Sequence, residues 1–280
     1  MPWQDWLQCQ LAYSEACAEL GLPAPQSDPR PHLLRARAFA GLRRPGDAVA
    51  EFAKAHDLSP VDPEIRLQLH HARARFHVAK YEWGRAADEF EIASELLPTE
   101  SYLLFFQAIS HLADSDVAAY RRVCAKMLDR FGATQDPRAA HTVAELCTII
   151  PDAVPDPNEL LPAARIASGW YPGASRIHGA VLYRTGDYQQ AVAVLEASAK
   201  FHSARAGDLF FLSMAQQRLG NTEEARRCLA AGVAWLEASN RPGPKDLHGT
   251  KPAWGRWDER VVVPLLRREA ETLLLGEQAE

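Results

Sequence analysis

Apolar and small residues between positions 172 and 237 recur at a fixed distance of 34 residues. The matching pairs are Gly186 with Gly220, Ala191 with Ala225, and Leu195 with Leu229. Each segment has two amphipathic halves joined by a glycine-containing turn, and self-similarity of this kind is typical of stacked helical hairpins. The pattern therefore predicts two hairpins, at about 173–201 and 206–238.

The first part of the chain follows the same pattern at an offset of 38 residues. The residues that return are Ala48, Phe52, Ala55 and Pro60, which correspond to Ala86, Phe90, Ala93 and Pro98. We expect hairpins at about 31–60 and 63–98 from this spacing. Asp62 is a helix-capping residue, and Pro63 suits the first helical position, so the second hairpin has a well-marked start.

Residues 100–170 keep the spacing with less regular residues, which predicts hairpins at about 100–131 and 137–170. The turn Asp114-Ser115-Asp116 lacks glycine, and Tyr120 stands where a small residue would be expected. Helix starts are marked by an aspartate followed by proline at residues 136–137 and 156–157. We expect this part to be the least regular of the array.

Both ends of the chain differ from the repeats. Residues 1–30 contain an amphipathic segment with two tryptophans and then a proline-rich break, which predicts one N-terminal helix. Residues 239–280 begin with an irregular, Pro- and Gly-rich run that includes Trp254 and Trp257. A last helix, starting at Asp258 or Pro264 and ending near Leu275, has one apolar and one charged face. We expect it to cap the last hairpin, which would otherwise expose its apolar side.

These residues resemble a tetratricopeptide repeat array over about 31–238. In the two clearest hairpins the resemblance rests on Gly179, Leu182, Tyr183, Gly186, Asp187, Tyr188, Ala191, Leu195, Ser198, Leu212, Gly220, Ala225 and Leu229. Earlier hairpins add Ala36, Phe39, Ala48, Phe52, Ala55, Pro60, Ala74, Ala86, Phe90, Ala93 and Pro98. It implies an all-α, right-handed α-α superhelix of about six hairpins. The aromatic residue expected early in each first helix is replaced by Ser175 and Leu209 in these two hairpins.

A narrower resemblance concerns residues 121–134 and 265–271, which are similar to repeat regions at the C-terminal ends of large planctomycete proteins. Many of those bacterial proteins carry protein kinase or propeller domains upstream. No Gly-rich loop or catalytic-loop motif of a kinase occurs in this sequence. The resemblance therefore implies a regulatory or assembly module of a kinase-type signalling system.

Composition narrows the possible partners. The formal net charge is −5, which argues against a general affinity for nucleic acid phosphate. No run of about 20 apolar residues predicts a membrane span, and the sequence shows no signal peptide. The five cysteines are scattered without metal or disulfide spacing, so we expect reduced thiols and a cytoplasmic location.

Candidate chemistry is sparse. His70, His71 and His77 share one expected helix but lack the i, i+4 spacing of a zinc-binding pair. Asp152, Asp156 and Glu159 fall near a helix start, where carboxylates cap backbone amides. We therefore expect no catalytic, metal or cofactor site and no enzyme activity.

The resemblance places the first helix of each hairpin on a concave face, where peptides usually lie. The expected partner-binding residues there are Leu33, Arg37, His71, Arg75, Phe105, Ile109, Arg176, Tyr183, Arg184, Phe210, Met214, Gln217 and Arg218. The set contains five arginines and no carboxylate, which favours an acidic or phosphorylated segment. However, 25 of the 31 basic residues are arginine, so composition and pairing between repeats explain the same arginines equally well.

The sequence therefore predicts a protein–protein interaction scaffold that binds a peptide segment or a partner protein in a concave groove. Two alternatives stay open. The groove could be filled by the segment that contains Trp254 and Trp257, which would make the array structural. The chain could instead regulate or assemble an enzyme that lies on another chain.

Overall fold

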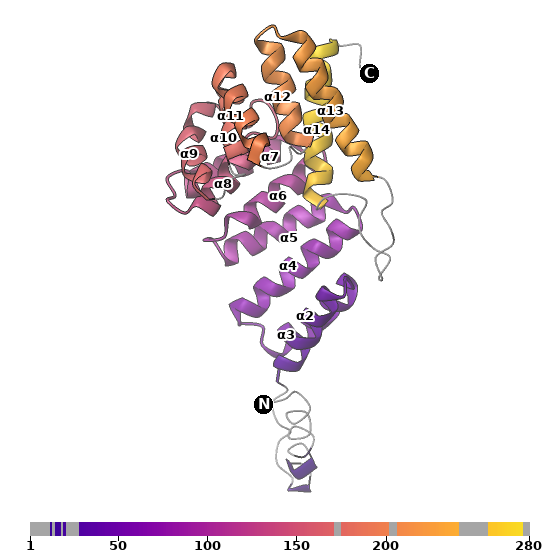
Figure 1. Ribbon diagram of the computed structural model, residues 1–280. Coiled ribbons are helices and arrows are strands. Elements are labelled where there is room, and N and C mark those ends of the chain that lie inside the picture. Colours follow the sequence, from indigo (N-terminus) through magenta and orange to yellow (C-terminus); the bar gives the residue numbers. More distant parts are fainter. Residues whose placement is uncertain are drawn as a thin grey trace. The chain divides into compact units, whose positions relative to one another are not determined.

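The computed structural model describes residues 28–170, 175–201, 206–240 and 257–276, together with residues 12, 15–17, 19 and 20. Within these residues the secondary structure is helical and contains no strand, which confirms the all-α prediction. Consecutive helices form antiparallel hairpins (Figure 1). Most of the expected N-terminal helix, and Trp254, lie outside the described residues.

The hairpins consist of a first and a second helix. The first helices are α2 (Arg30–Gly41), α4 (Pro63–Ala79), α6 (Ser101–Ala113), α8 (Pro137–Leu146), α10 (Ser175–Thr185) and α12 (Ala206–Arg218). The second helices are α3 (Pro45–Leu58), α5 (Trp83–Leu96), α7 (Val117–Phe131), α9 (Leu161–Ser168), α11 (Tyr188–Phe201) and α13 (Thr222–Asn240). A last helix, α14 (Trp257–Leu275), follows them.

Five of the hairpin turns share one backbone geometry. Each contains a single residue with positive φ, at Arg43, Tyr81, Ser115, Gly186 and Gly220. In each turn the next residue's N–H bonds to the carbonyl five positions earlier, for example Asp116 to His111 at 2.9 Å and Asp187 to Leu182 at 3.0 Å. This is the Schellman way of ending a helix. The turn is therefore conserved in shape even where the sequence lacks glycine.

The connection between α8 and α9 departs from this rule. A 3₁₀ turn, η1 (Pro157–Leu160), stands where the sequence predicted the start of an α-helix, and α9 begins at Leu161. Asp156 caps this turn by accepting a hydrogen bond from the N–H of Asn158. Because Pro157 lacks an N–H and the local bonds close over three residues, the segment tightens before α9 starts.

The chain divides into two compact units, residues 1–73 and 74–280, with the boundary inside α4. In the first unit Ala36, Phe52 and Leu69 form the core where α2, α3 and α4 meet. Glu51 is buried beside this core and accepts hydrogen bonds from Lys54 and Arg35, both at 2.7 Å. The bond from Arg35 ties α2 to α3, whereas the bond from Lys54 lies within α3.

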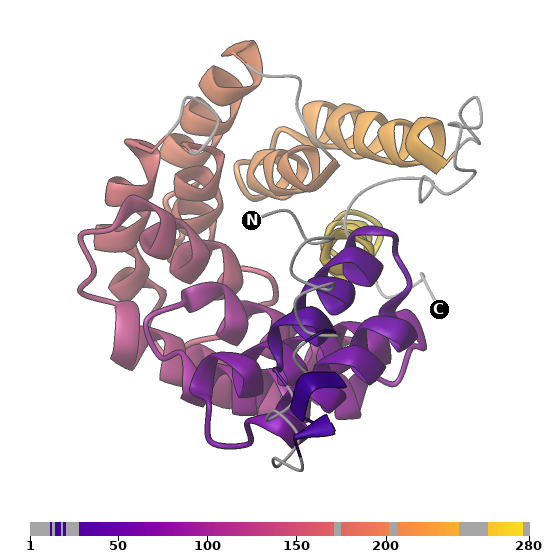
Figure 2. The same ribbon diagram turned by 90° about the horizontal axis from the view of Figure 1, so that it is seen from below.

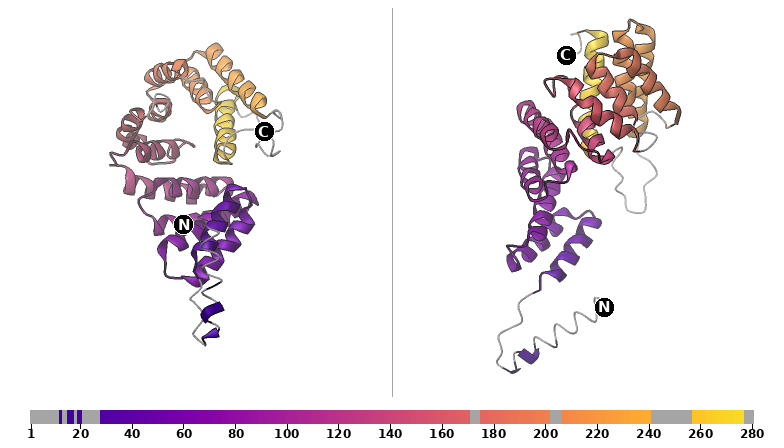
Figure 3. Two further views of the ribbon diagram at one scale, coloured as in Figure 1. Left: turned by 60° about the horizontal axis from the view of Figure 1, so that its bottom comes forward. Right: turned by 90° about the vertical axis from the view of Figure 1, so that its left-hand side faces the viewer.

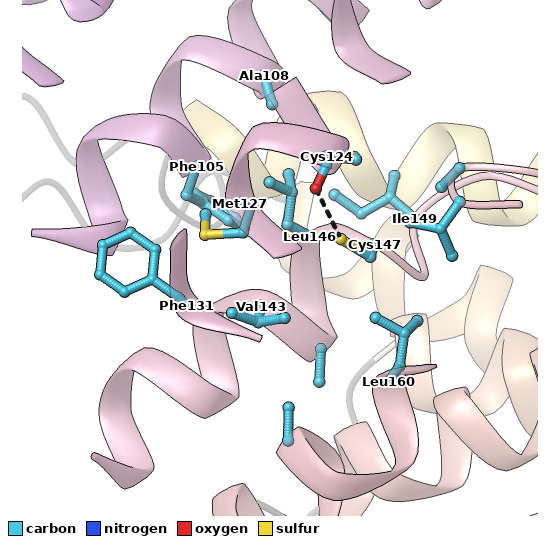
Figure 4. Packing of buried hydrophobic residues seen from close by; sticks show 14 of the residues in the cluster. Phe105, Ala108, Cys124, Met127, Phe131, Val143, Leu146, Cys147, Ile149 and Leu160 are labelled. Carbon is cyan, nitrogen blue, oxygen red and sulfur yellow. Dashed lines mark hydrogen bonds between the residues drawn. The ribbon is translucent and has the colours of Figure 1, made fainter. Parts of the chain in front are cut away.

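The second unit has two hydrophobic clusters. The first lies between α6, α7, α8 and α9 and includes Met127, Leu146 and Leu160, all fully buried (Figure 4). Tyr120 fits there despite its size, because its hydroxyl donates a hydrogen bond to the carbonyl of Leu146 at the end of α8. The second cluster joins α10, α11, α12 and α13 around Phe210 and Met214. Helix α14 contributes side chains to both clusters.

Candidate functional site

The surface of the second unit formed by α6, α8, α10 and α12 holds α14, and we call it the inner surface. Figures 2 and 3 show α14, in yellow, on the concave side of the curve that α8 to α13 follow. Helix α14 packs against α12 and α13 near its C-terminal half and against α6 near its N-terminal half. The last helix therefore does more than cap the last hairpin, because it also reaches the third one.

The pattern of α14 explains this position. Its inward-facing residues are Trp257, Val261, Val262, Leu265, Leu266, Ala270 and Leu273, which follow helical spacing on one stripe. The first members of the stripe pack on the cluster around α6, and the later members pack on the cluster around α12. Leu266 and Ala270 are buried. One amphipathic helix thus closes both clusters at once.

The N-terminal end of α14 is fixed by aromatic contacts. The indole of Trp257 stacks on Trp83 with ring centroids 5.9 Å apart and lies 5.4 Å from the ring of Phe106. The ring of Phe90 lies nearly parallel to the same indole, at 6.4 Å. Contacts of this geometry add to the burial of the apolar surface. We call Trp83, Phe90 and Phe106 the aromatic seat.

Twelve residues further on, α14 is fixed by an ion pair. The guanidinium of Arg184 on α10 forms a bidentate pair with the carboxylate of Glu269, with Nη2 to Oε2 at 2.7 Å. Its Nε donates to the carbonyl of Thr148 at 2.9 Å, and Nη2 reaches that of Ile149 at 3.3 Å. The Arg184 side chain is 8% exposed. A buried guanidinium needs such partners, because unpaired burial of a charge is costly.

Aromatic rings complete the surroundings of Arg184. Its Cζ lies 5.3 Å from the ring centroid of Phe211 and 5.4 Å from that of Tyr183, within cation–π range. Burial raises the pKa of Tyr183, and the negative charge of Glu269 raises it further. Arg184 and Arg218 lower this pKa, but by less. The phenol therefore stays protonated at neutral pH. This end of the inner surface is built to hold one carboxylate.

A pocket of about 90 Å³ remains between α14 and the inner surface. Its apolar lining includes Phe105, Ile177, Phe211 and Trp235 from the array and Val262, Val263 and Leu266 from α14. Its charged lining consists of Glu145, Arg176, Asp208, Asp258 and Glu259, and Arg176 pairs with Asp208 at 3.5 Å. The side chains of α14 therefore leave part of the groove unfilled.

The structure places the expected partner-binding residues in different environments. In the first unit, Arg37 is exposed and its Nε donates to Gln68 at 3.3 Å, while Leu33 and His71 are half-buried. In the second unit, Arg75 and Arg218 are exposed. Residues that line the pocket or surround α14 are Phe105, Arg176, Tyr183 and Arg184. Residues placed in the buried clusters are Ile109, Phe210 and Met214.

Phe210 illustrates the limit of reasoning from helix phase. Its ring lies between α12 and α13, because a Cβ built on Gly232 of α13 would come 2.6 Å from Phe210 Cε1. The side chain therefore fills the hairpin and does not face α14. Gln217 is half-buried at the C-terminal end of α12, and its binding role stays a prediction.

The sequence-based set included Arg184 but omitted the other groups that hold α14. It contained no carboxylate, whereas Glu145 and Asp208 lie on the inner surface and Glu269 faces Arg184. It also omitted the aromatic seat, whose members Trp83 and Phe90 come from α5, a second helix. The available signal was the apolar stripe of residues 257–275, which marked a helix that needed a surface without identifying that surface.

The thiols of Cys147 and Cys228 are buried and have raised pKa values. The Sγ of Cys147 lies 4.0 Å from the carbonyl of Cys124 (Figure 4), and its hydrogen bond with Cys124, together with burial, raises its pKa far above that of a free thiol. Burial and the nearby carboxylate of Glu224 raise the pKa of Cys228 to about 11. Protonated thiols are poor nucleophiles. No cluster of three metal-ligating side chains occurs in the described ranges.

The described helices also include none with both the length and the apolar character that crossing a membrane requires. The geometry thus defines an all-α array of helical hairpins that holds a helix on its inner surface. No protein-family model matches the sequence, and no curated protein matches it either.

Among solved structures, the chain is similar to NprR in complex with its cognate peptide NprX. The TM-score is 0.49 at 16% identity, covering 99% of this chain and 82% of that one. It is also similar to a tetratricopeptide repeat protein from Parabacteroides merdae ATCC 43184. There the TM-score is 0.42 at 9% identity, with 85% of this chain and 98% of that one covered. Neither similarity concerns the planctomycete repeat regions, so that resemblance stays a prediction.

Proposed function

We propose that the protein is a non-catalytic interaction module whose inner surface binds a helical segment of a partner protein. The observation that carries this proposal is α14 itself. The inner surface already holds an amphipathic helix, through the aromatic seat at one end and Arg184 at the other. A surface that recognises a helix within the chain has the features that helix-in-groove recognition requires.

We propose a narrower form of the expected preference for an acidic partner, namely one carboxylate at a fixed position. Arg184 is engaged by Glu269, and Arg176 is paired with Asp208, so two of the five groove arginines already have carboxylate partners. A partner that takes the place of α14 would need one carboxylate at the position of Glu269. Phosphorylation is not required by this arrangement, because a single carboxylate satisfies the planar fork of Arg184.

The test separates α14 from the array while keeping every residue of the protein. A protease recognition sequence is inserted between residues 241 and 256, and the purified chain is cut there. We expect the released α14 to co-elute with the array on gel filtration and to be displaced by an excess of labelled synthetic peptide 257–275, followed by fluorescence anisotropy. Displacement is expected because the contacts of α14 are non-covalent.

Two variants provide the controls. Arg184→Glu removes the pairing site and should abolish binding of the labelled peptide. Arg226→Glu changes the same charge on α13, where Arg226 pairs with the exposed Glu223, and should leave binding unchanged. The proposal fails if α14 separates from an array that keeps its helical circular dichroism and the labelled peptide does not bind to it.

A role in a kinase-type signalling system, a bacterial origin and a cytoplasmic location stay predictions from the sequence. No described contact favours one upstream system over another. The alternative of a self-filled groove is now specific, since α14 occupies the inner surface with Trp257 in the aromatic seat. Whether that occupancy is permanent or exchangeable decides between a structural array and a binding module.

A further inference from the structure

We infer that α14 is a replaceable occupant, and that the inner surface takes in its place a partner helix with an aromatic residue at one end and a carboxylate twelve residues later. This inference rests on the proposed function and names the partner's chemistry. Three features of the described residues support it: two anchor points at fixed separation, an incomplete fit, and a proline within α14.

The two anchors define the spacing that a partner must reproduce. Trp257 fills the aromatic seat and Glu269 meets Arg184, and twelve residues of helix separate them. At 1.5 Å per residue this is about 18 Å. Between the anchors the partner must present an apolar stripe to the two clusters, as Val262 and Leu266 do. A helix with these features matches both chemistry and length.

The fit of α14 to the inner surface is incomplete. The pocket of about 90 Å³ lies against Val262 and Val263, whose short side chains leave it unfilled. A cavity of about 10–15 Å³ is enough to hold one water molecule, so this pocket has room for larger side chains. A partner with leucine or isoleucine at these positions would bury more apolar surface than α14 does.

Carboxylates on the array restrict where the partner's own acidic group can go. Glu145 and Asp208 line the pocket, and Asp208 already occupies Arg176 at 3.5 Å. Helix α14 itself places Asp258 and Glu259 against the same pocket, so four carboxylates and one arginine already line it. A further acidic residue of the partner would meet like charge at the pocket, so the carboxylate that pairs with Arg184 belongs at the position of Glu269.

Helix α14 also carries an internal defect. Pro264 lies in its interior and exposes its ring to solvent. Proline has no N–H to bond to the carbonyl of Arg260 one turn earlier, and its ring crowds that carbonyl. The helix is therefore weaker than the same sequence with alanine would be. A partner helix without this proline avoids that cost, which acts against the benefit α14 gains from being on the same chain.

The test uses the intact, uncut chain and a fluorescein-labelled peptide 257–275, with affinity measured by fluorescence anisotropy. Glu269→Arg in the chain repels Arg184 and frees the inner surface. We expect it to bind the peptide at least tenfold more tightly than the wild-type chain. Pro264→Ala strengthens α14 and should bind the peptide at least threefold more weakly than wild type. Glu271→Arg is the matched control, since Glu271 pairs with Arg267 on α14 itself, and should behave as wild type.

A charge exchange tests the partner chemistry separately. The chain with Arg184→Glu should prefer the peptide that carries Glu269→Arg over the wild-type peptide by at least tenfold. The chain with Glu269→Arg should show the opposite preference. Misfolding of either variant would lower both affinities and would not reverse the order. A peptide with Val263→Leu should bind severalfold more tightly than the wild-type peptide, because it fills the pocket.

The outcomes are distinguishable. If no chain binds any peptide, the proposed function itself is wrong. If wild type, Glu269→Arg and Pro264→Ala bind the peptide equally, the inner surface binds helices but α14 does not compete for it, and the inference is overturned. If the charge exchange gives no reversal, Arg184 does not select the carboxylate and the stated partner chemistry is wrong.

Discussion

Arg184 shows how a residue can be located from the sequence while its function cannot. The repeat spacing predicts that it lies on a surface lined by first helices, and in the structure its guanidinium faces α14. Its partner Glu269 lies 85 residues away along the chain. No local pattern links the two, because a buried ion pair is set by tertiary packing. The residue that the sequence offered for an external acidic group is therefore already paired.

Glu51 gives a pH-dependent prediction at the same scale. Burial opposes its ionisation, but hydrogen bonds from Lys54, Arg35 and His32 outweigh burial and hold its pKa at about 2. A lowered pKa stabilises the fold above the unfolded-state value near 4.5, and this contribution is lost as pH falls towards 2. We expect Glu51→Gln to lower the free energy of unfolding by roughly 2–3 kcal/mol at pH 7.

The measurement is urea denaturation followed by circular dichroism at pH 7 and at pH 3. The difference between wild type and Glu51→Gln should shrink at the lower pH, because the carboxyl group of the unfolded state is protonated there while that of the native state is still mostly ionised. Glu223→Gln is the control, since that side chain is 91% exposed and its surface ion pair contributes little. An equal loss at both pH values would contradict the ionic role of Glu51.

The hairpins could be predicted from the sequence, whereas the surface on which α14 packs could not. Hairpins follow from spacing because small residues, glycine turns and capping aspartates act within some 40 residues. Even the turn around Ser115 keeps the common geometry without glycine. Helix α14 was expected, with its end at Leu275, but its surface was not. A cap on the last hairpin and a helix along the inner surface require the same apolar stripe, so the pattern does not distinguish them.

The shared turn geometry predicts opposite effects for two substitutions. Ser115 has φ 63° and Gly186 has φ 87°, and a side chain in this region costs about 1–2 kcal/mol. Ser115→Gly should therefore raise the free energy of unfolding by about 0.5–1 kcal/mol, after the entropy cost of glycine. Gly186→Ala should lower it by about 1 kcal/mol, although nothing lies within 4 Å of the added Cβ.

Chemical denaturation of both variants tests this pair, with Gly41→Ala as the reference. Gly41 ends α2 without positive φ, and its Cβ would also meet nothing within 4 Å. That substitution should be neutral or slightly stabilising, because alanine is the better helix former. If Gly186→Ala proved equally harmless, the left-handed turn would not be present in solution.

At the scale of the molecule, the two units have different relations to function. The first unit contains Arg37 and His71, whose partner-binding role stays a prediction, and its described contacts explain structure alone. The second unit contains the inner surface, its occupant and the unfilled pocket. The all-α array was predictable from repeats. The occupied inner surface was not, because Trp257 meets residues more than 150 positions earlier in the chain.

Hydrogen–deuterium exchange of residues 257–275 tests this account most directly. An isolated helix of 19 residues is marginally stable in water and exchanges rapidly. The account predicts that α14 amides in the wild-type chain are protected far more than those of an isolated helix, although less than those of α12. It also predicts that Arg184→Glu removes this protection while α12 and α13 keep theirs. Rapid exchange of α14 in the wild-type chain would show that the inner surface does not hold it.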